Sequence, residues 1–355
     1  MSKVLVCGGA GYIGSHMCKR LSETGHDVVV CDDLSTGHAG ALLWGEHVQG
    51  SIADTEFLRR LFSQHGFDGV LHFAARSSVA ESVSDPEGYY QHNVSATLNL
   101  LQVMREFDVD KFVFSSTAAI FGEPQATTID EDHPTKPLNP YGWSKLIVEQ
   151  VLRDSARAYG LRAVSLRYFN AAGADPSGLI GEAHFPETHL IPKLLRKAAG
   201  EDIAVTINGT DYPTQDGTCV RDYVHVDDLA DAHMLALGHL DYAVGFHTFN
   251  LGNGAGHSVR QVLAAIREIS GAKLDLPVGS RRPGDPSHLV ASSERARSIL
   301  GWAPRYTKVG DIIETAMRWH AGPTFKDWMR VAASRRVSQG QQKTTVPDRA
   351  RPARA

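Results

Sequence analysis

The chain has 355 residues, of which 42% are hydrophobic and 21% charged, and its formal net charge is −4 at pH 7. This length predicts two domains, or one large domain with a smaller partner, and the composition is ordinary for a globular protein. Without a run of about 18 apolar residues no membrane helix or membrane partner is expected, and the acidic charge argues against nucleic acid.

The beginning of the chain and its cysteines indicate a cytoplasmic protein. The first predicted strand starts at Lys3, which leaves no room for a secretory signal. The four cysteines show no CxxC spacing and are expected to be buried free thiols in a reducing compartment. They are Cys7, Cys18, Cys31 and Cys219.

In the first 170 residues, short runs rich in Val and Phe alternate with amphipathic segments. The predicted buried strands are KVLVCGG, DVVVCDD, HVQG, GVLHFAA, KFVFSST and RAVSLRYFN. Helices are predicted over residues 14–24, 55–65, 89–107 and 141–159. Strands that alternate with helices predict an α/β fold of the Rossmann type, a doubly wound parallel sheet covered on both faces.

After Asn170 the pattern changes. Residues 171–189 are rich in Gly and Pro and have no period, which is unusual in a compact domain unless the segment is functional. A smaller mixed α/β domain is predicted over residues 171–325, and its strands can interleave with those of the first domain. Its predicted helices cover 189–199, 227–240, 258–270 and 309–320, and its predicted strands cover 203–207 and 246–251.

The last segment, residues 326–355, is predicted to be a basic, disordered tail. From position 331 onward it has six basic residues and one acidic residue, so that segment carries +5 and the rest of the chain −9. It contains few large apolar residues and no helical or strand period. Binding to an acidic partner is the alternative, and no further feature supports it.

The first predicted strand runs directly into a glycine-rich loop that opens a helix. In VLVCGGAGYIGSH, Gly8, Gly11 and Gly14 follow the GxxGxxG pattern. Glycines let a backbone turn sharply and approach a pyrophosphate, and the helix N-terminus offers free N–H groups and partial positive charge. This context predicts a dinucleotide site, although a glycine-rich turn without a ligand has the same letters.

The second predicted strand ends in two acids. Asp32 stands where a carboxylate holds the ribose 2′-hydroxyl of the adenosine, and Asp33 could share that role. A carboxylate there repels a 2′-phosphate, which favours NAD over NADP. The alternative is that both acids are only solvated.

The next strand and helix add weaker signals. HFAAR ends the fourth strand, where small Ala74 and Ala75 would let the backbone touch a cofactor, and Asn93 lies early in the following helix. A packing explanation is about as good for each of these residues.

The segment NPYGWSK, residues 139–145, places a phenol and a cation one helical turn apart. Tyr141 and Lys145 therefore share a face of the predicted helix, and the strand KFVFSST ends in Thr117. A nearby ammonium and an oxidised nicotinamide would favour the phenolate and lower the pKa of Tyr141. With the Thr117 hydroxyl to orient a substrate oxygen, these are the parts for taking a hydroxyl proton as hydride leaves. A surface pair without a role is the alternative.

These residues resemble the extended short-chain dehydrogenase/reductases, and within them the nucleotide-sugar 4-epimerases that act on UDP-glucose and UDP-galactose. The resemblance covers residues 1–320 approximately. It rests on GGAGYIGSH, FSSTAAIFG, PYGWSK, LRYFNAAGADPSG and DYPTQDGTCVRDYVHVDDLADAH, of which the last is long enough to be specific.

The resemblance implies a set of tight contacts to NAD. Beyond the glycines, the acids and the two alanines, the implied cofactor residues are Tyr12, Ile13, Ser51, Ile52, Phe73, Asn93, Tyr141, Lys145 and Phe169. Ser51 replaces an expected Asp that would hold the adenine, so a weaker grip on NAD is plausible.

The resemblance also implies a UDP-sugar site with Tyr141 as the base, Lys145 beside it and Thr117 as its partner. Two arginines would clamp the diphosphate, because planar guanidinium groups bind phosphate oxygens with two parallel hydrogen bonds. The other implied substrate residues include Leu289, which replaces a bulky aromatic and could leave room for an N-acetyl group. The remaining implied residues are Asn170, His189, Leu190, Arg221, Arg282 and Asp285. An internal pair with Asp222 or Asp227 is the alternative for Arg221.

The implied reaction is the interconversion of UDP-galactose and UDP-glucose through a transient 4-keto sugar and NADH. Some activity on UDP-N-acetylhexosamines is a hypothesis. A 4-epimerase of UDP-arabinose, UDP-xylose or UDP-glucuronate is the main alternative. A redox sensor without turnover is disfavoured because Thr117, Tyr141 and Lys145 are all present.

Two further enzyme classes are disfavoured. A 4,6-dehydratase needs an acid pair after the threonine, where this chain has Ala118 and Ala119. The 17 histidines show no HExxH or similar spacing, so no metal is expected.

The family also implies a homodimer formed through the helices near 89–107 and 141–159.

Overall fold

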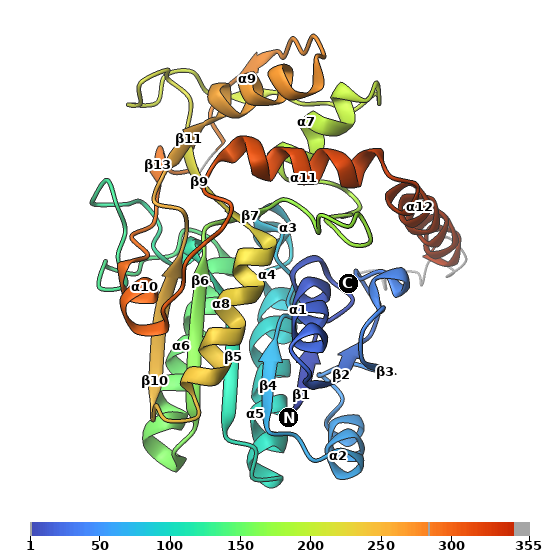
Figure 1. The fold of residues 1–355 in the computed structure, drawn as a ribbon, viewed down its shortest axis with the longest axis vertical. Coiled ribbons are helices and arrows are strands. Elements are labelled where there is room, and N and C mark those ends of the chain that lie inside the picture. Colours follow the sequence, from blue (N-terminus) through green and yellow to red (C-terminus); the bar gives the residue numbers. More distant parts are fainter. Residues whose placement is uncertain (1, 283–284, 344–355) are drawn as a thin grey trace, which may run out of the picture.

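The computed structural model describes residues 2–282 and 285–343 (Figure 1). Its largest element is a seven-stranded parallel sheet with the strand order β10-β6-β5-β4-β1-β2-β3. This is a Rossmann-type doubly wound sheet, as predicted. The strands are β1 (Lys3–Cys7), β2 (Asp27–Asp32), β3 (Glu46–Gln49), β4 (Gly69–His72), β5 (Lys111–Thr117), β6 (Arg162–Tyr168) and β10 (Phe246–Leu251).

Helices cover both faces of this sheet, because its strands are apolar on both sides. One face packs against α1 (Tyr12–Glu23) and α8 (Val226–His239). The other face packs against α2 (Thr55–Gln64), α5 (Ala96–Glu106) and α6 (Pro140–Tyr159). All four cysteines are buried free thiols.

The predicted helix 89–107 is built from three pieces. Helix α4 (Pro86–Tyr90) runs into a π-helical turn, η2 (Gln91–Ser95), and then into α5. Short elements complete this half of the molecule. They are η1 (Ala39–Ala41), α3 (Val79–Ser84) and η3 (Ala118–Ile120).

A smaller mixed α/β unit lies beyond the carboxyl ends of the strands (Figure 1). Its central sheet has the order β11-β9-β13 with β7 paired to β9, and β8 and β12 form a separate pair. Only the last residue of the predicted strand 203–207 is in a strand, so that prediction is wrong. The elements are β7 (Asn170–Ala172), α7 (Leu190–Ala198), β8 (Ile207–Asn208), β9 (Val220–His225), β11 (Gly256–Ser258), α9 (Val259–Ser270), β12 (Val278–Gly279), β13 (His288–Leu289) and α11 (Val309–Ala321). Helix α10 (Glu294–Leu300) packs instead on the large sheet, against α8 (Val226–His239) and β10.

The chain crosses between the two units more than once. After β9 it returns to the large sheet, where α8 covers one face and β10 pairs with β6 over six residues. Residues 226–251, which lie inside the predicted second domain, therefore belong to the first. Within 2–282 and 285–343, no helix has both the length and the apolar character needed to cross a membrane.

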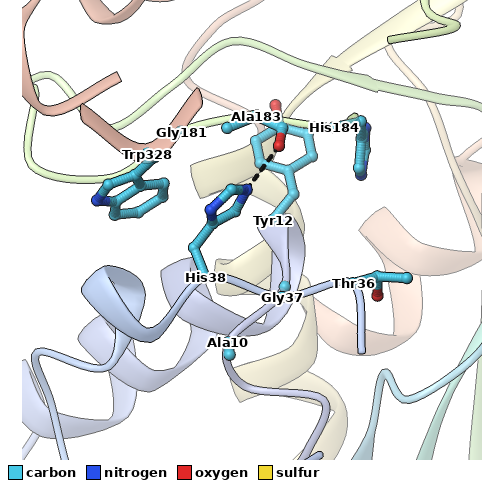
Figure 2. Close-up of a pocket in the computed structure, with 10 residues that line it drawn as sticks. Ala10, Tyr12, Thr36, Gly37, His38, Gly181, Ala183, His184 and Trp328 are labelled. Carbon is cyan, nitrogen blue, oxygen red and sulfur yellow. Dashed lines mark hydrogen bonds between the residues drawn. The ribbon is translucent and has the colours of Figure 1, made fainter. Parts of the chain in front are cut away.

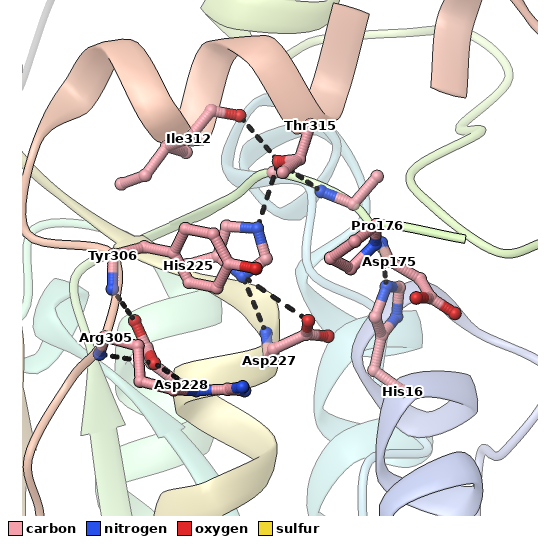
Figure 3. A network of polar contacts seen from close by, with 12 residues as sticks. His16, Asp175, Pro176, His225, Asp227, Asp228, Arg305, Tyr306, Ile312 and Thr315 are labelled. Atoms are coloured by element: carbon pink, nitrogen blue, oxygen red, sulfur yellow. Dashed lines mark hydrogen bonds and ion pairs between the residues drawn. The ribbon is translucent and has the colours of Figure 1, made fainter. Parts of the chain in front are cut away.

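A buried polar network ties the two units together (Figure 3). On α1, the His16 ring accepts a hydrogen bond from the backbone N–H of Asp175 at 3.1 Å. His225 bonds to Thr315 of α11 at 3.0 Å, and its other ring nitrogen accepts from the Asp227 N–H. Burial, reinforced by the nearby Asp175 charge, raises the pKa of Asp227 to about 7. The network fixes the second unit against the start of the first helix.

The predicted disordered tail is instead a helix over much of its length. Helix α12 (Pro323–Lys343) follows α11 directly, and the prediction was wrong for this part. Phe325 and Trp328 are buried, and the Trp328 ring stacks on His38 at a centroid distance of 5.0 Å. The buried residues Phe325 and Trp328 and the partly buried Met329 have the i, i+3, i+4 spacing of one helix face, but this pattern spans only the first two turns, which is too short to predict a helix of this length. The remainder of the predicted tail, 344–355, lies outside the described residues.

Trp328 should therefore be the anchor of α12. We expect Trp328→Ala to lower the free energy of unfolding by about 3 kcal/mol, because it empties a largely buried site, and to raise hydrogen exchange along α12. Val331→Ala, on the exposed side of the same helix, should change stability by less than about 0.5 kcal/mol. Denaturant titration and hydrogen exchange measure both effects, and equal losses in the two variants would contradict the anchor.

Candidate active site

The candidate site lies at the carboxyl edge of the large sheet, where β1 and β4 are neighbours. From β1 the chain continues outward to β2 and β3 on one side. It then crosses back to β4 on the other side of β1 and continues outward to β5 and β6. The strand order therefore reverses between β1 and β4. In open α/β sheets such a switch point leaves a crevice between the two loops. The glycine loop follows β1, and HFAAR follows β4.

The glycine loop needs its glycines for space. Gly8 has φ +84°, and a Cβ there would lie 2.5 Å from the backbone N of Ala74. A Cβ on Gly14 would lie 2.2 Å from the carbonyl oxygen of Gly8. Gly11 is the N-cap of α1 and has no side chain to cap it. The first N–H groups of α1, at Tyr12 and Ile13, therefore face a region suited to an anion.

Asp32 organises this loop from the end of β2. One of its carboxylate oxygens accepts from the backbone N–H of Ala10 at 2.9 Å, and the other accepts from Leu34 at 2.8 Å. Leu34 has φ +57°, which is uncommon outside glycine and marks a constrained turn. Burial raises the pKa of Asp32, and these two bonds oppose the rise. Asp33, in a more exposed position, accepts from the backbone N–H of Ser35.

The other predicted cofactor contacts of this half lie around the same loop. Tyr12 donates its hydroxyl to the Gly173 carbonyl at 2.7 Å, so it also bridges to the second unit. Ser51 accepts from the Ala53 N–H at 3.3 Å, and Ile52 is buried. A small pocket of about 40 Å³ beside Tyr12 is lined by Thr36, Gly37, His38, His184 and Trp328, together with the backbone of the glycine loop (Figure 2).

The segment after β4 is held by Asn93 from the π-helical turn. The Asn93 amide oxygen accepts from the Arg76 N–H at 2.9 Å, and its NH₂ donates to the Arg76 carbonyl and to Ser144. Its position thus fixes Ala74 and Ala75 relative to α6. Phe73 packs in the apolar core with its ring 4.7 Å from that of His233. Here the sequence predicted a cofactor contact, and the structure adds a positioning role.

Tyr141 and Lys145 lie in the first turns of α6. The helix begins at Pro140, and the Asn139 side chain caps it by accepting from the Gly142 N–H at 2.9 Å. Lys145 is only 3% exposed, and its ammonium donates to the Ser115 carbonyl at 2.8 Å. The same Nζ lies 4.7 Å from the centre of the Phe114 ring. Helix α6 thus brings its cation against the end of β5, as the strand and helix pattern predicted.

Burial dominates the ionisation of both groups. It lowers the pKa of Lys145 to about 7, and the Glu149 charge opposes this only partly. It raises the pKa of Tyr141, while a hydrogen bond with Thr117 acts in the opposite direction. The protein without a cofactor therefore does not hold Tyr141 as a phenolate. A further positive charge beside the phenol is needed for that.

A buried carboxylate lies one helical turn beyond Lys145. Glu149 accepts hydrogen bonds from Ser116 at 2.7 Å and Ser165 at 2.8 Å. It also forms a fully buried ion pair with Arg167 at 2.7 Å. This network joins α6 to β5 and β6, and it thereby fixes the position of Lys145 relative to the ends of these strands. Sequence reasoning did not find it, because its members are far apart in the chain and match no motif.

An apolar wall follows Thr117. Ala118, Phe121, Phe169 and Leu289 belong to one packed cluster, with the two phenyl rings 6.4 Å apart. The Thr117 hydroxyl accepts from the Ala119 N–H at 3.1 Å. This wall has no acid where a dehydratase would need one.

The second unit contributes cations on β9 and on the segment before β13. Arg221 is paired with Asp285, and its guanidinium also donates to the Val220 carbonyl at 2.7 Å. Arg282 lies against the Asn208 amide. Arg282 and Asp285 line an open cleft of about 520 Å³. Leu289 is the register partner of Arg221 in the β13–β9 pair, so the apolar wall meets the cations here.

Neither predicted internal partner of Arg221 is used. Asp222 instead accepts from the backbone N–H groups of Asn253, Gly254 and Ala291, and burial raises its pKa to about 6. The pairing partner, Asp285, was itself a predicted site residue.

Three predicted substrate residues lie near the start of α7 or in β7. Asn170 opens β7, Leu190 opens α7, and His189 is the N-cap of α7. The Nδ1 atom of His189 contacts the buried carboxylate of Glu182. Sequence reasoning missed Glu182, because the segment before α7 has no period that would assign it a place.

These residues fit a dinucleotide. The crevice combines a loop whose glycines leave no room for a Cβ, a helix start without a side-chain cap, and a strand-end carboxylate that carries no arginine partner among the described residues. Phosphate, ribose hydroxyls and a flat ring are the chemistry that this set accommodates.

Comparison with known proteins gives a consistent result. Residues 4–252 match the family described as the NAD dependent epimerase/dehydratase family. The UDP-glucose 4-epimerase of Lacticaseibacillus casei is 52% identical over 318 residues, which are 89% of this chain and 96% of that protein. The UDP-glucose 4-epimerase of Halalkalibacterium halodurans is 51% identical over 317 residues, 89% of this chain and 95% of that protein.

Solved structures agree with the fold. The UDP-glucose 4-epimerase from Brucella ovis in complex with NAD is 46% identical, with a TM-score of 0.86 over 89% of this chain and 98% of that chain. The UDP-glucose 4-epimerase from Bifidobacterium longum in complex with NAD⁺ and UDP is 37% identical, with a TM-score of 0.87 over 91% of this chain and 100% of that chain.

Proposed function

The chain belongs to the NAD dependent epimerase/dehydratase family, and from this premise we propose that it interconverts UDP-galactose and UDP-glucose with NAD as its cofactor. It is an isomerase. Its relatives at about 50% identity over most of the chain are UDP-glucose 4-epimerases, and the predicted catalytic residues are all present at the sheet edge.

We assign the base to Tyr141. The phenol is partly buried beside Thr117, whose hydroxyl orients the sugar 4-hydroxyl and stabilises the phenolate through a hydrogen bond. The hydrogen bond from Lys145 to the Ser115 carbonyl fixes the position of the ammonium group. Its positive charge therefore acts on the phenol of Tyr141 from a fixed position. Tyr141 then takes the proton from the sugar hydroxyl and returns it after the sugar has turned.

The cofactor contacts follow from the crevice. The N–H groups at the start of α1 would hold the pyrophosphate, and Asp32 would accept from the adenosine ribose while it keeps the glycine loop in place. Lys145 would hold the nicotinamide ribose. NAD supplies reversible acceptance of hydride at the sugar C4, and it must remain bound between the two halves of the reaction.

We assign the diphosphate to the cations of the second unit. Arg221 and Arg282 would bind its oxygens, and Asp285 now holds the Arg221 guanidinium in position. The apolar side chains of Phe169 and Leu289, which pack on the buried Phe121, offer the sugar few hydrogen bonds. A firmly held nucleotide and a loosely held sugar suit a reaction in which the sugar must turn over.

The observation that carries this proposal is the convergence of Thr117, Tyr141 and Lys145 at the end of β5, in a chain with these relatives. The test is incubation of the purified protein with UDP-galactose and no added NAD. We expect UDP-glucose to form until the two sugars reach equilibrium, because bound NAD is regenerated in each turnover. Failure to convert UDP-galactose after NAD has been supplied would contradict the assignment.

Other UDP-sugars remain candidate substrates. Leu289 borders the sugar wall where a bulkier side chain would restrict it, which supports some activity on UDP-N-acetylglucosamine. UDP-arabinose and UDP-xylose lack the C6 hydroxymethyl group of UDP-galactose and UDP-glucose, and UDP-glucuronate has it oxidised to a carboxylate, so each could use the same chemistry at C4. Assays of all four beside UDP-galactose rank them.

We also infer a cytoplasmic homodimer. The helices α5 and α6 carry exposed apolar side chains, with Leu98 45%, Trp143 43% and Ile147 37% exposed, and pairing these faces between two copies would cover them. The four free cysteines suit a reducing compartment. Light scattering tests the dimer.

A further inference from the structure

Two Glu-x-His pairs lie in the loop between β7 and α7, in the sequence Glu182-Ala-His184-Phe-Pro-Glu187-Thr-His189. The structure brings all four side chains together. One carboxylate oxygen or ring nitrogen from each lies within 4.8 Å of the other three. The sequence analysis predicted no metal site because it found no known metal-ligand motif. A repeated Glu-x-His is not one of those motifs, so the search could not detect it.

The contacts converge on Glu182. One oxygen of its carboxylate lies 3.0 Å from Nδ1 of His184 and also contacts Nδ1 of His189. Nδ1 of His189 is 3.9 Å from the Glu187 carboxylate. Both histidines therefore direct Nδ1 at Glu182, and His189 also directs it toward Glu187, as ligands of one ion would.

The charges call for a cation. The side chains of Glu182 and Glu187 are only 4% and 2% exposed, and they lie beside each other. Among residues 2–282 and 285–343, neither acid forms an ion pair with lysine or arginine, and their ion-pair partners are the two imidazoles. Lys193 and His320 act on Glu187 and Glu182 only at longer range. Two buried carboxylates that share one site repel each other, and a dication between them removes that repulsion.

The donor set indicates which cation. Two imidazole nitrogens with two carboxylate oxygens suit Zn²⁺, which binds tetrahedrally to nitrogen and oxygen ligands. Ca²⁺ and Mg²⁺ take oxygen ligands and do not explain the histidines. We propose that Glu182, His184, Glu187 and His189 form a structural zinc site.

The surroundings are prepared for this role. Glu187 accepts from the backbone N–H groups of Thr188 and His189 at 2.7 and 2.8 Å, which orients its carboxylate. The backbone of Glu182 is fixed to α11 by a hydrogen bond from Trp319 Nε1 at 2.8 Å. Such outer contacts orient metal ligands in known sites.

The site would fasten the loop to the cofactor crevice. The ring of His184 lies 6.3 Å from that of Tyr12, and both residues line the pocket beside the glycine loop (Figure 2). His189 caps α7, whose first residue is Leu190. One ion would thus fix the start of α7 and the loop against Tyr12 at once. It takes no part in hydride or proton transfer.

The test uses untagged full-length protein with its NAD, freed of metal with a chelator and then reloaded with Zn²⁺. Mass spectrometry of the washed protein should find about one zinc per chain, and competition with a chromophoric chelator gives the affinity. His184→Gln should weaken binding at least about 100-fold, and so should Glu187→Gln, whose amide oxygen can still accept the two N–H groups. His65→Gln, at the end of α2, removes an imidazole elsewhere and should leave binding unchanged.

Zinc content and zinc affinity do not depend on catalysis, so this test is independent of whether the proposed reaction is correct. Zinc should also raise the thermal midpoint of the wild type and of His65→Gln, but not that of His184→Gln. Retention of much less than one zinc per chain, or equal zinc affinity in wild type and both site variants, would overturn the proposal. Binding of Mg²⁺ or Ca²⁺ in preference to Zn²⁺ would also overturn it.

Discussion

Tyr141→Phe should lower kcat for UDP-galactose about 1,000-fold, because the variant lacks the only group assigned to take the sugar proton and general base catalysis contributes about 10²- to 10⁴-fold. The phenyl ring keeps the packing of α6, so the fold should be unchanged. Bound NAD and the Kd for UDP should also stay near their wild-type values. Steady-state kinetics with UDP titration and measurement of bound nucleotide separate these effects.

Tyr159→Phe is the matched control for that experiment. Tyr159 is the last residue of the same helix, and it is 39% exposed. It loses the same hydroxyl at a place remote from the crevice and should keep full activity. If Tyr141→Phe retains activity within about threefold of the wild type, another residue is the base.

Lys145→Met should have opposite effects on activity and stability. Activity should fall by at least about 100-fold, because the phenolate loses the charge that favours it. Stability of the NAD-free protein at pH 7 should rise, since the variant no longer buries an ammonium group whose pKa is lowered to about 7. The methionine retains the length and flexibility of the side chain and fits the same space.

The pH dependence follows from the direction of that shift. Unfolded Lys145 would hold its proton up to its ordinary pKa of 10.5, whereas the folded protein releases it near 7. Between these values the unfolded state binds more protons, so this residue makes stability rise with pH. At ~1.4 kcal/mol per pKa unit, the wild type should gain about 2 kcal/mol between pH 7 and 9 relative to Lys145→Met.

Denaturant titrations of the NAD-free proteins at several pH values measure this difference. Lys273→Met, at an exposed site, should follow the wild type throughout. Parallel pH profiles for wild type and Lys145→Met would show that the buried ammonium does not control stability.

Local patterns were sufficient for the sheet and the crevice. Strands such as β1 and β2 follow directly from continuous apolar runs (VLVC and VVVC), since the centre of a parallel strand covered on both faces is apolar on both sides. Gly8 and Gly14 were predictable because a dinucleotide loop needs glycine at these positions, and an added Cβ would lie 2.5 Å and 2.2 Å from another backbone atom. Tyr141 and Lys145 were predictable because helical spacing alone puts them on one face.

Other features depend on contacts that no local pattern contains. Asp285 holds Arg221 across 64 positions, and nothing near Arg221 in the sequence selects it over Asp222 or Asp227. Helix α12 is fixed by Trp328 against His38, which a search for apolar periodicity cannot find. The four zinc-ligand candidates lie close together in the sequence, but only the folded loop between β7 and α7 shows that their side chains converge.

The pairing of β10 with β6 determines when the protein can fold during its synthesis. Phe246 is the partner of Ala163 and Leu251 that of Tyr168, so the hydrogen-bonding edge of β6 has no partner until residue 251 has left the ribosome. A fragment that stops at residue 170 would expose that edge, together with the apolar surface that α8 covers. We therefore expect the nascent chain to need protection over this interval, and proteolysis to yield no stable N-terminal half.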